Sequence, residues 1–391
     1  MDMLPVDNPT ASYWLSDPHP LAKFRSSDAV PDETDIAIIG TGMADARDAC
    51  SGATGRNGGH VKTILASVKK WYESHGPDGA AVIIAWVAAQ CRALKKIVEE
   101  EELDCEFLVR RSYDVLGVEW LDELQWLEGP HLDRIVGAKG AVAAVGGPAV
   151  SLWPYKLVTS LLALVVDKGA KLYTNTAVHA IDRGSDTIKL STSRGAMRAK
   201  KVVYATNGYT AGLLPQYHSV IVPFLGQNSR LVPNEQTLRQ SPNLAATLNL
   251  HHRADSVDYL NPRPDGSITH GAARATSGGT RMTATSVAPD FERIDREKLY
   301  GWEDSEAKVD SIWTGVMGLT PDGLPHVGQV PGTRNEWLLA GFNGGGMVFI
   351  FTITQGLADM VLDGKELEQT AIPMLFKTTE ERLQNKCEDV K

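Results

Sequence analysis

The sequence lacks several patterns that mark whole classes of protein. It has only 4 cysteines in 391 residues, and their spacing fits neither a metal site nor a disulfide framework. Its longest apolar run, Gly79 to Ala89, falls short of the ~18 residues that a membrane helix needs. The first residues show no secretory signal and the last ones no peroxisomal or retention tag, so we expect a cytoplasmic protein without a bound metal.

Positive charge is also scarce. The chain has 39 Lys and Arg against 48 Asp and Glu, a formal net charge of −9, which argues against a general nucleic-acid surface. No Ser/His/Asp nucleophile set or zinc motif stands out either. The composition, 43% hydrophobic and 22% charged, is that of a globular protein with two or three cores. With nucleic acid disfavoured, we expect a small molecule as the partner. The sequence does not indicate the oligomeric state.

The apolar pattern predicts an α/β fold. Asp35–Ile39 fits a buried parallel strand, and Tyr155–Lys168 fits an amphipathic helix that ends at Gly169. Three strands are expected next, in KLYTNTAVHAID, IKLSTSRG and MRAKKVVYATNGY, as in a right-handed crossover. From Ile221 to about Ala288, strand-like patches separated by Pro, Gly and Ser indicate an antiparallel sheet. Helices are also predicted over 61–71, 80–102 and 347–362, with strands in 104–116 and 337–341.

The predicted domains interleave along the chain. Residues 1–34 form an irregular lead-in and 365–391 a C-terminal tail. The remaining segments divide between a discontinuous cofactor domain, 35–80, 150–220 and 331–364, and an inserted substrate domain, 81–149 and 221–330.

A short glycine turn follows the first predicted strand. In IIGTGM, Gly40 and Gly42 match the first two glycines of the G-x-G-x-x-G motif, which permit a tight turn and close approach to a pyrophosphate. The third glycine would stand at position 45, which is Asp45. This half-motif alone leaves two interpretations open: a nucleotide-binding turn, or the glycine turn that follows many buried strands.

The following residues carry a more specific signal. DARD at 45–48 and SGATGRNGGH at 51–60 resemble the E-A-R-D…S-G-A-T-G-R-N-G-G-H run of FAD-dependent oxidoreductases in the D-amino-acid oxidase/glycine oxidase/sarcosine oxidase (DAO) superfamily. The resemblance covers roughly Asp35 to Gly364 and is closest to fungal-type members. It implies an FAD/NAD(P)-binding Rossmann-like domain, here incomplete, with an inserted and mainly antiparallel substrate domain.

The resemblance also implies which residues hold FAD. Asp45 would bind the adenosine ribose, Arg47 would lie beside the adenine, and the backbone near Val178 would pair with the adenine edge. Free N–H groups at the start of the last helix would stabilise negative charge on the reduced flavin. Relatives commonly have His where Gly345 stands. The other implied cofactor-binding residues are Gly40 and Gly42; Gly55, Arg56, Asn57, Gly58, Gly59 and His60; Thr206, Asn207 and Gly208; and Gly341, Asn343, Gly344, Gly345, Gly346 and Met347.

One part of the binding unit is missing from the sequence. In a complete unit the acidic residue follows the glycines by about 20 residues, whereas Asp45 follows Gly40 by five positions. A strand–helix–strand unit takes about 30 residues, and a parallel strand cannot follow its partner through a tight turn. We therefore expect that the first crossover helix and most of the second strand are lost between Met43 and Ala44. Two explanations stay open. Either the sequence is a shortened gene model or splice form of a normal flavoenzyme, or the protein truly lacks this segment and binds FAD poorly or not at all.

The reaction implied by the resemblance is the oxidation of a C–N bond. FAD would take hydride from the carbon of an amine, amino acid or related small molecule, with O2 as acceptor, in a secondary-metabolism setting. The candidate catalytic residues are Tyr259 and Arg263, which would hold a carboxylate, and His60 and Asn343 beside the flavin. The alternatives are a solvent-exposed hairpin role for Arg263 and a polar-support role for His60.

Two other function classes stay open. One is a flavin-free relative that uses the pocket for binding or for non-redox catalysis such as a cyclisation or isomerisation. The other is an unstable fragment without activity.

Overall fold

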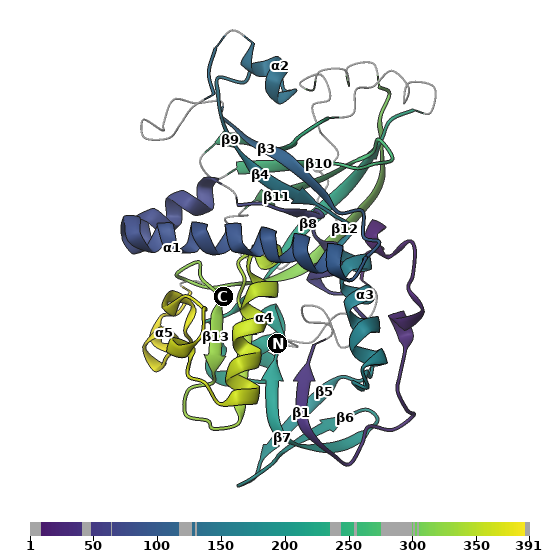
Figure 1. Cartoon of the computed structure of the whole chain (residues 1–391), viewed down its shortest axis with the longest axis vertical. Helices are drawn as coiled ribbons and strands as arrows, with labels where there is room; N and C mark the ends of the chain where they lie inside the picture. The colour runs from purple at the N-terminus through teal and green to yellow at the C-terminus, as the bar shows by residue number, and fades with distance from the viewer. Residues whose placement is uncertain are drawn as a thin grey trace.

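Two β-sheets lie one above the other along the long axis of the molecule, with the long helix α1 (Leu65–Glu100) between them (Figure 1). This computed structural model describes residues 9–40, 48–63, 65–116, 127–129, 131–234, 244–253, 256–274, 299, 302 and 305–387. The arrangement is the α/β fold that the sequence predicts, with a parallel core in one sheet and a mainly antiparallel second sheet.

The smaller sheet contains the parallel strands. β1 (Glu33–Ile39), β7 (Gly195–Tyr204) and β14 (Glu336–Ala340) run parallel, with β7 in the middle. β5 (Val178–Arg183), β6 (Ile188–Thr192) and β7 form an antiparallel meander, and β13 (His326–Gln329) pairs antiparallel with β14. The first and last predicted strands of the cofactor domain are therefore both neighbours of the strand that ends in Tyr204.

One edge of the smaller sheet differs from the prediction. KLYTNTAVHAID is strand only from Val178 onward, and residues 171–176 make one isolated bridge, Tyr173 with Arg25. Among the described strands, β1 pairs with β7 alone, so its other edge has no neighbour. The backbone of this segment pairs with the N-terminal lead-in instead: the Ser26 N–H donates to the Leu172 carbonyl at 2.9 Å and the Thr174 N–H to the Phe24 carbonyl at 3.2 Å.

The larger sheet is mainly antiparallel, as expected for a substrate domain. Its strand order is β12-β8-β11-β10-β9-β3-β4-β2, and only the β3–β9 pair is parallel. The two sheets do not follow the predicted domain boundaries. His60–Val61, predicted in the cofactor domain, belongs to the larger sheet, and β13, predicted in the substrate domain, belongs to the smaller one. The bounds are β2 (His60–Val61), β3 (Leu108–Leu116), β4 (Ala143–Ser151), β8 (Val222–Val232), β9 (Thr247–Arg253), β10 (Ser256–Pro262), β11 (Ile268–Arg274) and β12 (Lys308–Leu319).

The helices pack mainly between and beside the sheets. The two helices predicted over 61–71 and 80–102 are one element, α1, which kinks at Gly76 (φ 69°) and Pro77. α1 packs on α4 (Gly346–Asp363), and the Gln90 side chain joins them by donating to the Met347 carbonyl at 2.9 Å. The remaining α-helices of the described chain are α2 (Leu132–Val136), α3 (Pro154–Asp167) and α5 (Glu380–Gln384).

Helix α4 is a core helix. Among the described residues it alone has the length and apolar composition to cross a membrane. Phe349, Ile353 and Leu357 are nevertheless buried in the same core as Trp71 and Ile83 of α1. The predicted C-terminal tail joins this core as well, through buried Leu367, Ile372 and Phe376, so it is part of the folded body.

Candidate functional site

Three chain turns meet at the carboxyl ends of the parallel strands. Gly40 ends β1 with φ 123°, and a Cβ there would lie 2.5 Å from the Ala205 carbonyl oxygen at the end of β7. The Asn207 Oδ1 accepts from the backbone N–H groups of Gly341 at 3.1 Å and Phe342 at 3.3 Å, after β14. Only a glycine fits the approach of Gly40, and Asn207 ties the other two turns together.

The third turn leads into helix α4 without a side-chain cap. Asn343 and Gly344 adopt the left-handed region, φ 52° and 80°, and Gly345 is the N-cap residue. The first N–H groups of an α-helix have no partner within the helix, and the helix dipole makes this end positive. The start of α4, Gly346 and Met347, therefore offers donors and positive potential to an anionic group.

The glycine run 55–60 is held against the larger sheet by its carbonyl groups. The Gly58 carbonyl accepts from Asn261 Nδ2 at 2.9 Å and Thr269 Oγ1 at 2.8 Å. A Cβ on Gly58 would lie 2.1 Å from the Tyr259 ring, and one on Gly59 would lie 2.6 Å from the Trp14 ring. The run thus passes between two aromatic side chains with no room for a larger residue.

Strand β12 connects this run to the other turns. A Cβ on Gly315 would lie 2.9 Å from the Arg56 side chain, and one on Gly318 would lie 2.8 Å from Asn207 Oδ1. These two glycines are three positions apart on one strand, a span of roughly 10 Å. A Cβ on Gly208 would lie 2.7 Å from the Met317 carbonyl on the same strand. The structure therefore gathers glycine turns from the front, middle and back of the chain into one region.

Several predicted cofactor-binding side chains are engaged by the protein itself. The buried Arg56 guanidinium donates to the carbonyls of Ser51 at 2.7 Å, Thr10 at 2.7 Å and Thr314 at 3.0 Å. Asn57 donates to the Thr54 carbonyl at 2.9 Å. The side chains of both residues shape the run, which favours backbone rather than side-chain contact with a ligand. Gly42, Asp45 and Arg47 lie outside the described residues.

A polar row crosses the inner face of the larger sheet. Tyr259 donates to Asn228 Oδ1 across Gly271, whose missing side chain leaves room for the phenol. Burial raises the pKa of Tyr259 above its usual value, so it stays protonated. Strand register places its members directly opposite one another: Asp114, Asn249, Tyr259, Gly271, Asn228 and Trp313.

His60 packs on this row as a neutral ring. Its ring centroid lies 4.9 Å from that of Tyr259. Burial, and then the Lys62 charge, lower the pKa of His60 to about 3, against a smaller opposing effect of Asp114. Its Nδ1 is buried with no hydrogen-bond partner in the described part of the chain. This arrangement agrees with the polar-support interpretation of His60.

Sequence reasoning missed a buried ionic cluster next to His60. Lys62 Nζ lies 2.8 Å from Asp114 Oδ2, and Asp114 Oδ1 also accepts from His251 Nε2 at 2.9 Å and Asn249 Nδ2 at 3.0 Å. Burial acts to raise the pKa of Asp114, but Lys62 and the two hydrogen bonds lower it to about 2. The sequence signal was GGHVK, because residues 60 and 62 of a strand share one face.

The structure contradicts the solvent-exposed interpretation of Arg263. Its side chain is 0% exposed, so it is not a surface arginine. The guanidinium pairs with Glu106 and donates to Ser151 Oγ at 3.1 Å and the Leu152 carbonyl at 3.0 Å. It also lies over the Trp14 ring, 5.0 Å from the ring centroid. Its charge is balanced inside the protein, so a substrate carboxylate would compete with Glu106 for Arg263.

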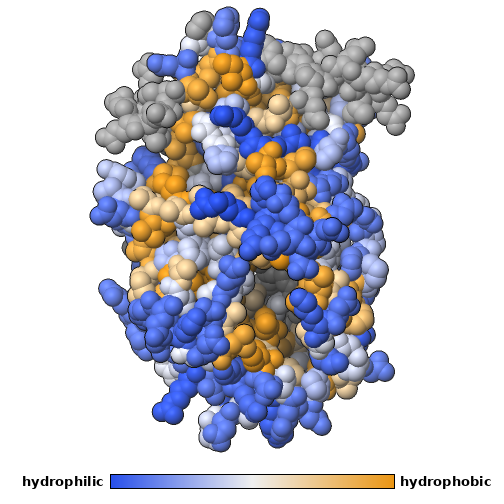
Figure 2. Space-filling model, viewed as in Figure 1, coloured by the Kyte–Doolittle hydropathy of each residue, from blue (hydrophilic) through white to orange (hydrophobic). Residues whose placement is uncertain are grey.

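A pocket of 540 Å³ opens on the unpaired side of β1. Figure 2 shows hydrophobic side chains in a hollow of the lower half, where Figure 1 places β1. Gly40, Thr206 and Val178 line the same pocket, so the predicted adenine-binding backbone shares it with two of the turns. Other lining residues come from β1, α3 and the segment 171–177, and include Ile36, Ile38, Leu162, Val166, Leu172 and Tyr173.

These features fit FAD, an elongated anionic dinucleotide. Open α/β sheets bind ligands at the carboxyl ends of their parallel strands, which is where the three turns meet. The uncapped start of α4 suits the electron-rich edge of a flavin. The 540 Å³ pocket at the other end of the same edge suits an adenosine. The residues that would hold FAD are thus the turns at Gly40, 55–60, 206–208 and 341–347.

Comparison with known proteins agrees with this geometry. The family model DAO, FAD dependent oxidoreductase, matches residues 37–360. A probable oxidoreductase OrdL of Rhizobium meliloti is 22% identical over 388 residues, which span 88% of this chain and 86% of that protein.

Solved structures share the fold. The crystal structure of glycine oxidase from Geobacillus kaustophilus has a TM-score of 0.68 at 20% identity, over 90% of this chain and 99% of that one. L-amino acid deaminase from Proteus myxofaciens, in complex with anthranilate, has a TM-score of 0.68 at 15% identity, over 95% and 97% of the two chains. Since the family match spans most of the sequence, the chain belongs to the DAO family of FAD-dependent oxidoreductases, and its cofactor is FAD.

Proposed function

We propose that this chain oxidises the C–N bond of an amine, amino acid or related small molecule, with FAD as hydride acceptor and O2 as the final acceptor. The observation that carries the proposal is the convergence of the glycine turns on the carboxyl ends of β1, β7 and β14, opposite a polar sheet face. Structural relatives named glycine oxidase and L-amino acid deaminase support the amine class.

The chain's own residues would bind and orient the substrate. Bound FAD supplies the hydride acceptor. The Tyr259 and His60 rings, 4.9 Å apart, form an uncharged wall beside the glycine run. Lys62, two residues after His60, is a buried cation, and its charge is balanced by Asp114. We propose that these groups position the substrate, which donates the hydride, because the Arg263 guanidinium is already paired with Glu106.

We further propose that the first crossover helix and the second strand are absent from the fold. Two observations on β1 support this: one of its edges is unpaired among the described strands, and Ile38 is 64% exposed. Residues 171–176 form no strand, and a pocket lies between that segment and β1. A fungal origin, a secondary-metabolism substrate and a cytoplasmic location remain predictions from the sequence. The absence of this segment would weaken binding of the adenosine half of FAD more than binding of the flavin half.

The test is the visible spectrum of the purified full-length chain. We expect flavin bands after incubation with FAD, anaerobic bleaching by at least one member of a panel of amines, sarcosine and D- and L-amino acids, and H2O2 when air is admitted. A folded, colourless protein that takes up no FAD would refute the proposal and favour a flavin-free binding protein or non-redox enzyme. Genomic DNA between codons 43 and 44 separates a gene-model error from a true loss, because only the former has coding sequence there.

A further inference from the structure

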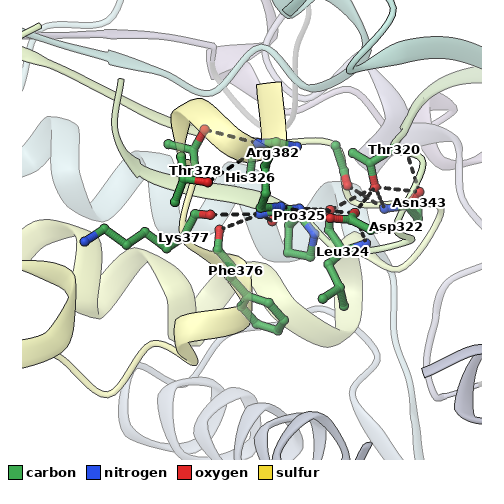
Figure 3. A network of polar contacts seen from close by, with 12 residues as sticks. Thr320, Asp322, Leu324, Pro325, His326, Asn343, Phe376, Lys377, Thr378 and Arg382 are labelled. Atoms are coloured by element: carbon green, nitrogen blue, oxygen red, sulfur yellow. Dashed lines mark hydrogen bonds and ion pairs between the residues drawn. The ribbon is translucent and has the colours of Figure 1, made fainter. Parts of the chain in front are cut away.

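The family match ends at residue 360. The C-terminal segment that follows it contacts the loop Thr320–His326 through the side chain of one arginine, Arg382 (Figure 3). The Arg382 guanidinium, 16% exposed, donates to Asp322 from Nε at 2.9 Å and from a terminal nitrogen at 3.2 Å. It also donates to four carbonyls, those of Leu324, Pro325, Phe376 and Lys377, at 3.1, 3.0, 3.2 and 3.0 Å. This forked, charge-assisted contact locks the loop against the tail.

The gripped loop in turn holds Asn343. Asp322 Oδ1 lies 3.1 Å from the Thr320 hydroxyl. The Thr320 hydroxyl accepts from Asn343 Nδ2 at 2.9 Å, and the Thr320 N–H donates to Asn343 Oδ1 at 2.8 Å. The Thr320 hydroxyl has one proton, and the Leu324 carbonyl, 2.9 Å away, is its other acceptor. Because Arg382 donates to both Asp322 and Leu324, a path of hydrogen bonds runs from Arg382 through these two acceptors and Thr320 to Asn343.

The Asn343 backbone is in the left-handed region, φ 52°, which asparagine adopts more readily than most L-residues when its side chain is hydrogen-bonded locally. Its side chain also donates to the Gly341 carbonyl at 2.7 Å, and its N–H donates to the Gly318 carbonyl at 2.8 Å. The next residues, Gly344 and Gly345, lead directly into the uncapped start of α4. The direction in which that helix end points is thus set by the conformation of Asn343.

We propose that Arg382 is a positioning residue for the flavin: through Asp322, Thr320 and Asn343 it sets the turn 341–346 that presents the start of α4 to FAD. This inference rests on the proposed flavin role of that turn. It gives a function to a C-terminal segment that lies outside the family match. The Arg382 side chain acts at a distance and touches neither FAD nor substrate.

A stability role alone is the competing explanation, because the same segment buries Leu367, Ile372 and Phe376 in the core. The experiment compares Arg382→Ala, Arg382→Lys, Asp322→Asn and Thr320→Val with Arg92→Ala, an exposed arginine of α1. Asp322→Asn and Thr320→Val leave the core contacts of the tail in place. The readouts on the full-length protein are the Kd for FAD from flavin fluorescence, the band shape of the bound flavin, and the thermal midpoint of the apoprotein.

We expect Arg382→Ala, Asp322→Asn and Thr320→Val each to raise the Kd for FAD about tenfold and to alter the flavin band shape. Arg382→Lys should recover part of the loss, and the Arg382→Ala/Thr320→Val double variant should be little worse than either single variant, because both break one path. Arg92→Ala should match wild type. Unchanged Kd and band shape in Asp322→Asn and Thr320→Val would overturn the inference, even if Arg382→Ala fails to fold.

A second readout separates this inference from the proposed function. If wild type takes up no FAD, the proposed function fails, and amide hydrogen exchange over residues 341–347 of the apoprotein tests the path instead. Faster exchange there in Asp322→Asn and Thr320→Val than in Arg92→Ala supports the positioning role. Equal exchange in all three variants refutes it.

Discussion

The Lys62 ammonium lies 2.8 Å from the Asp114 carboxylate, and the two side chains are only 5% and 9% exposed. Lys62 follows the strand that ends the glycine run, whereas Asp114 belongs to β3 in the interior of the larger sheet. Asp114 also accepts from the Leu65 N–H at the start of α1, at 3.2 Å. The ion pair therefore joins the end of the glycine run 55–60, the larger sheet and the helix between the two sheets.

Removing one partner of this pair should cost more than removing both. Lys62→Met leaves a buried carboxylate without its countercharge, and we expect the free energy of unfolding to fall by roughly 3 kcal/mol. Lys62→Met/Asp114→Asn should recover much of that loss because no unpaired charge remains. Urea unfolding followed by circular dichroism measures both. The matched control is Lys69→Met, whose partner Glu73 is 59% exposed; a loss in the control as large as in Lys62→Met would contradict this view.

Acid should destabilise the protein through His60. Its pKa is lowered to about 3 by burial and by Lys62, while the unfolded value is about 6.5. The unfolded chain therefore binds a proton that the folded chain resists, and stability declines as the pH falls from about 6.5 toward 3. His326, with its pKa also lowered to about 3 by burial and Arg382, adds a parallel decline.

The measurement is the free energy of unfolding against pH for wild type and His60→Gln. The wild-type slope between about pH 4 and 6 should exceed that of the variant by up to about 1.4 kcal/mol per pH unit, the effect of one proton. Identical slopes in the two proteins would show that His60 is protonated in the fold. His218→Gln, at an exposed position, is the control.

Gly58 should tolerate no side chain. Gly58→Ala places a Cβ 2.1 Å from the Tyr259 ring, and we expect a loss of about 1–3 kcal/mol in stability together with weaker FAD binding. Gly147→Ala on β4 of the same sheet is the matched control, because a Cβ there meets nothing within 4 Å. Urea unfolding and FAD titration of both variants decide the matter; equal behaviour of the two would mean that Tyr259 can move aside at little cost.

Supplying the helix and strand that we propose are absent should strengthen FAD binding. An insertion of about 20 residues between Met43 and Ala44, designed as a helix and a strand, would give β1 its second neighbour beside the 540 Å³ pocket and leave that pocket open for the adenosine. We expect a Kd for FAD at least tenfold lower and a higher thermal midpoint. A Gly/Ser insertion of equal length is the control. If both insertions bind FAD like the parent chain, the unpaired edge of β1 has no bearing on the cofactor.

Local patterns in the sequence determined the nature of the pieces. The strand Asp35–Ile39, the helix Tyr155–Lys168 and the helix that opens at Gly346 follow from apolar periodicity and glycine turns, which act over a few residues. The glycine turns at Gly40, Asn207–Gly208 and Gly341 were equally readable, since each follows an apolar strand, although β1 is only partly buried in the fold. The family resemblance led to the prediction that these turns bind FAD together.

Tertiary structure alone decided which charges and strands meet. Arg263 is neutralised by Glu106, and Lys62 by Asp114, because sheet pairing brings together residues that are far apart in the chain. Residues 171–176 have the composition of a strand yet make only one isolated bridge, because their backbone meets the N-terminal lead-in at Phe24 and Ser26, a contact that local sequence does not encode. The grip of Arg382 on Asp322 likewise exists only because the C-terminal segment folds back on a loop 60 residues earlier.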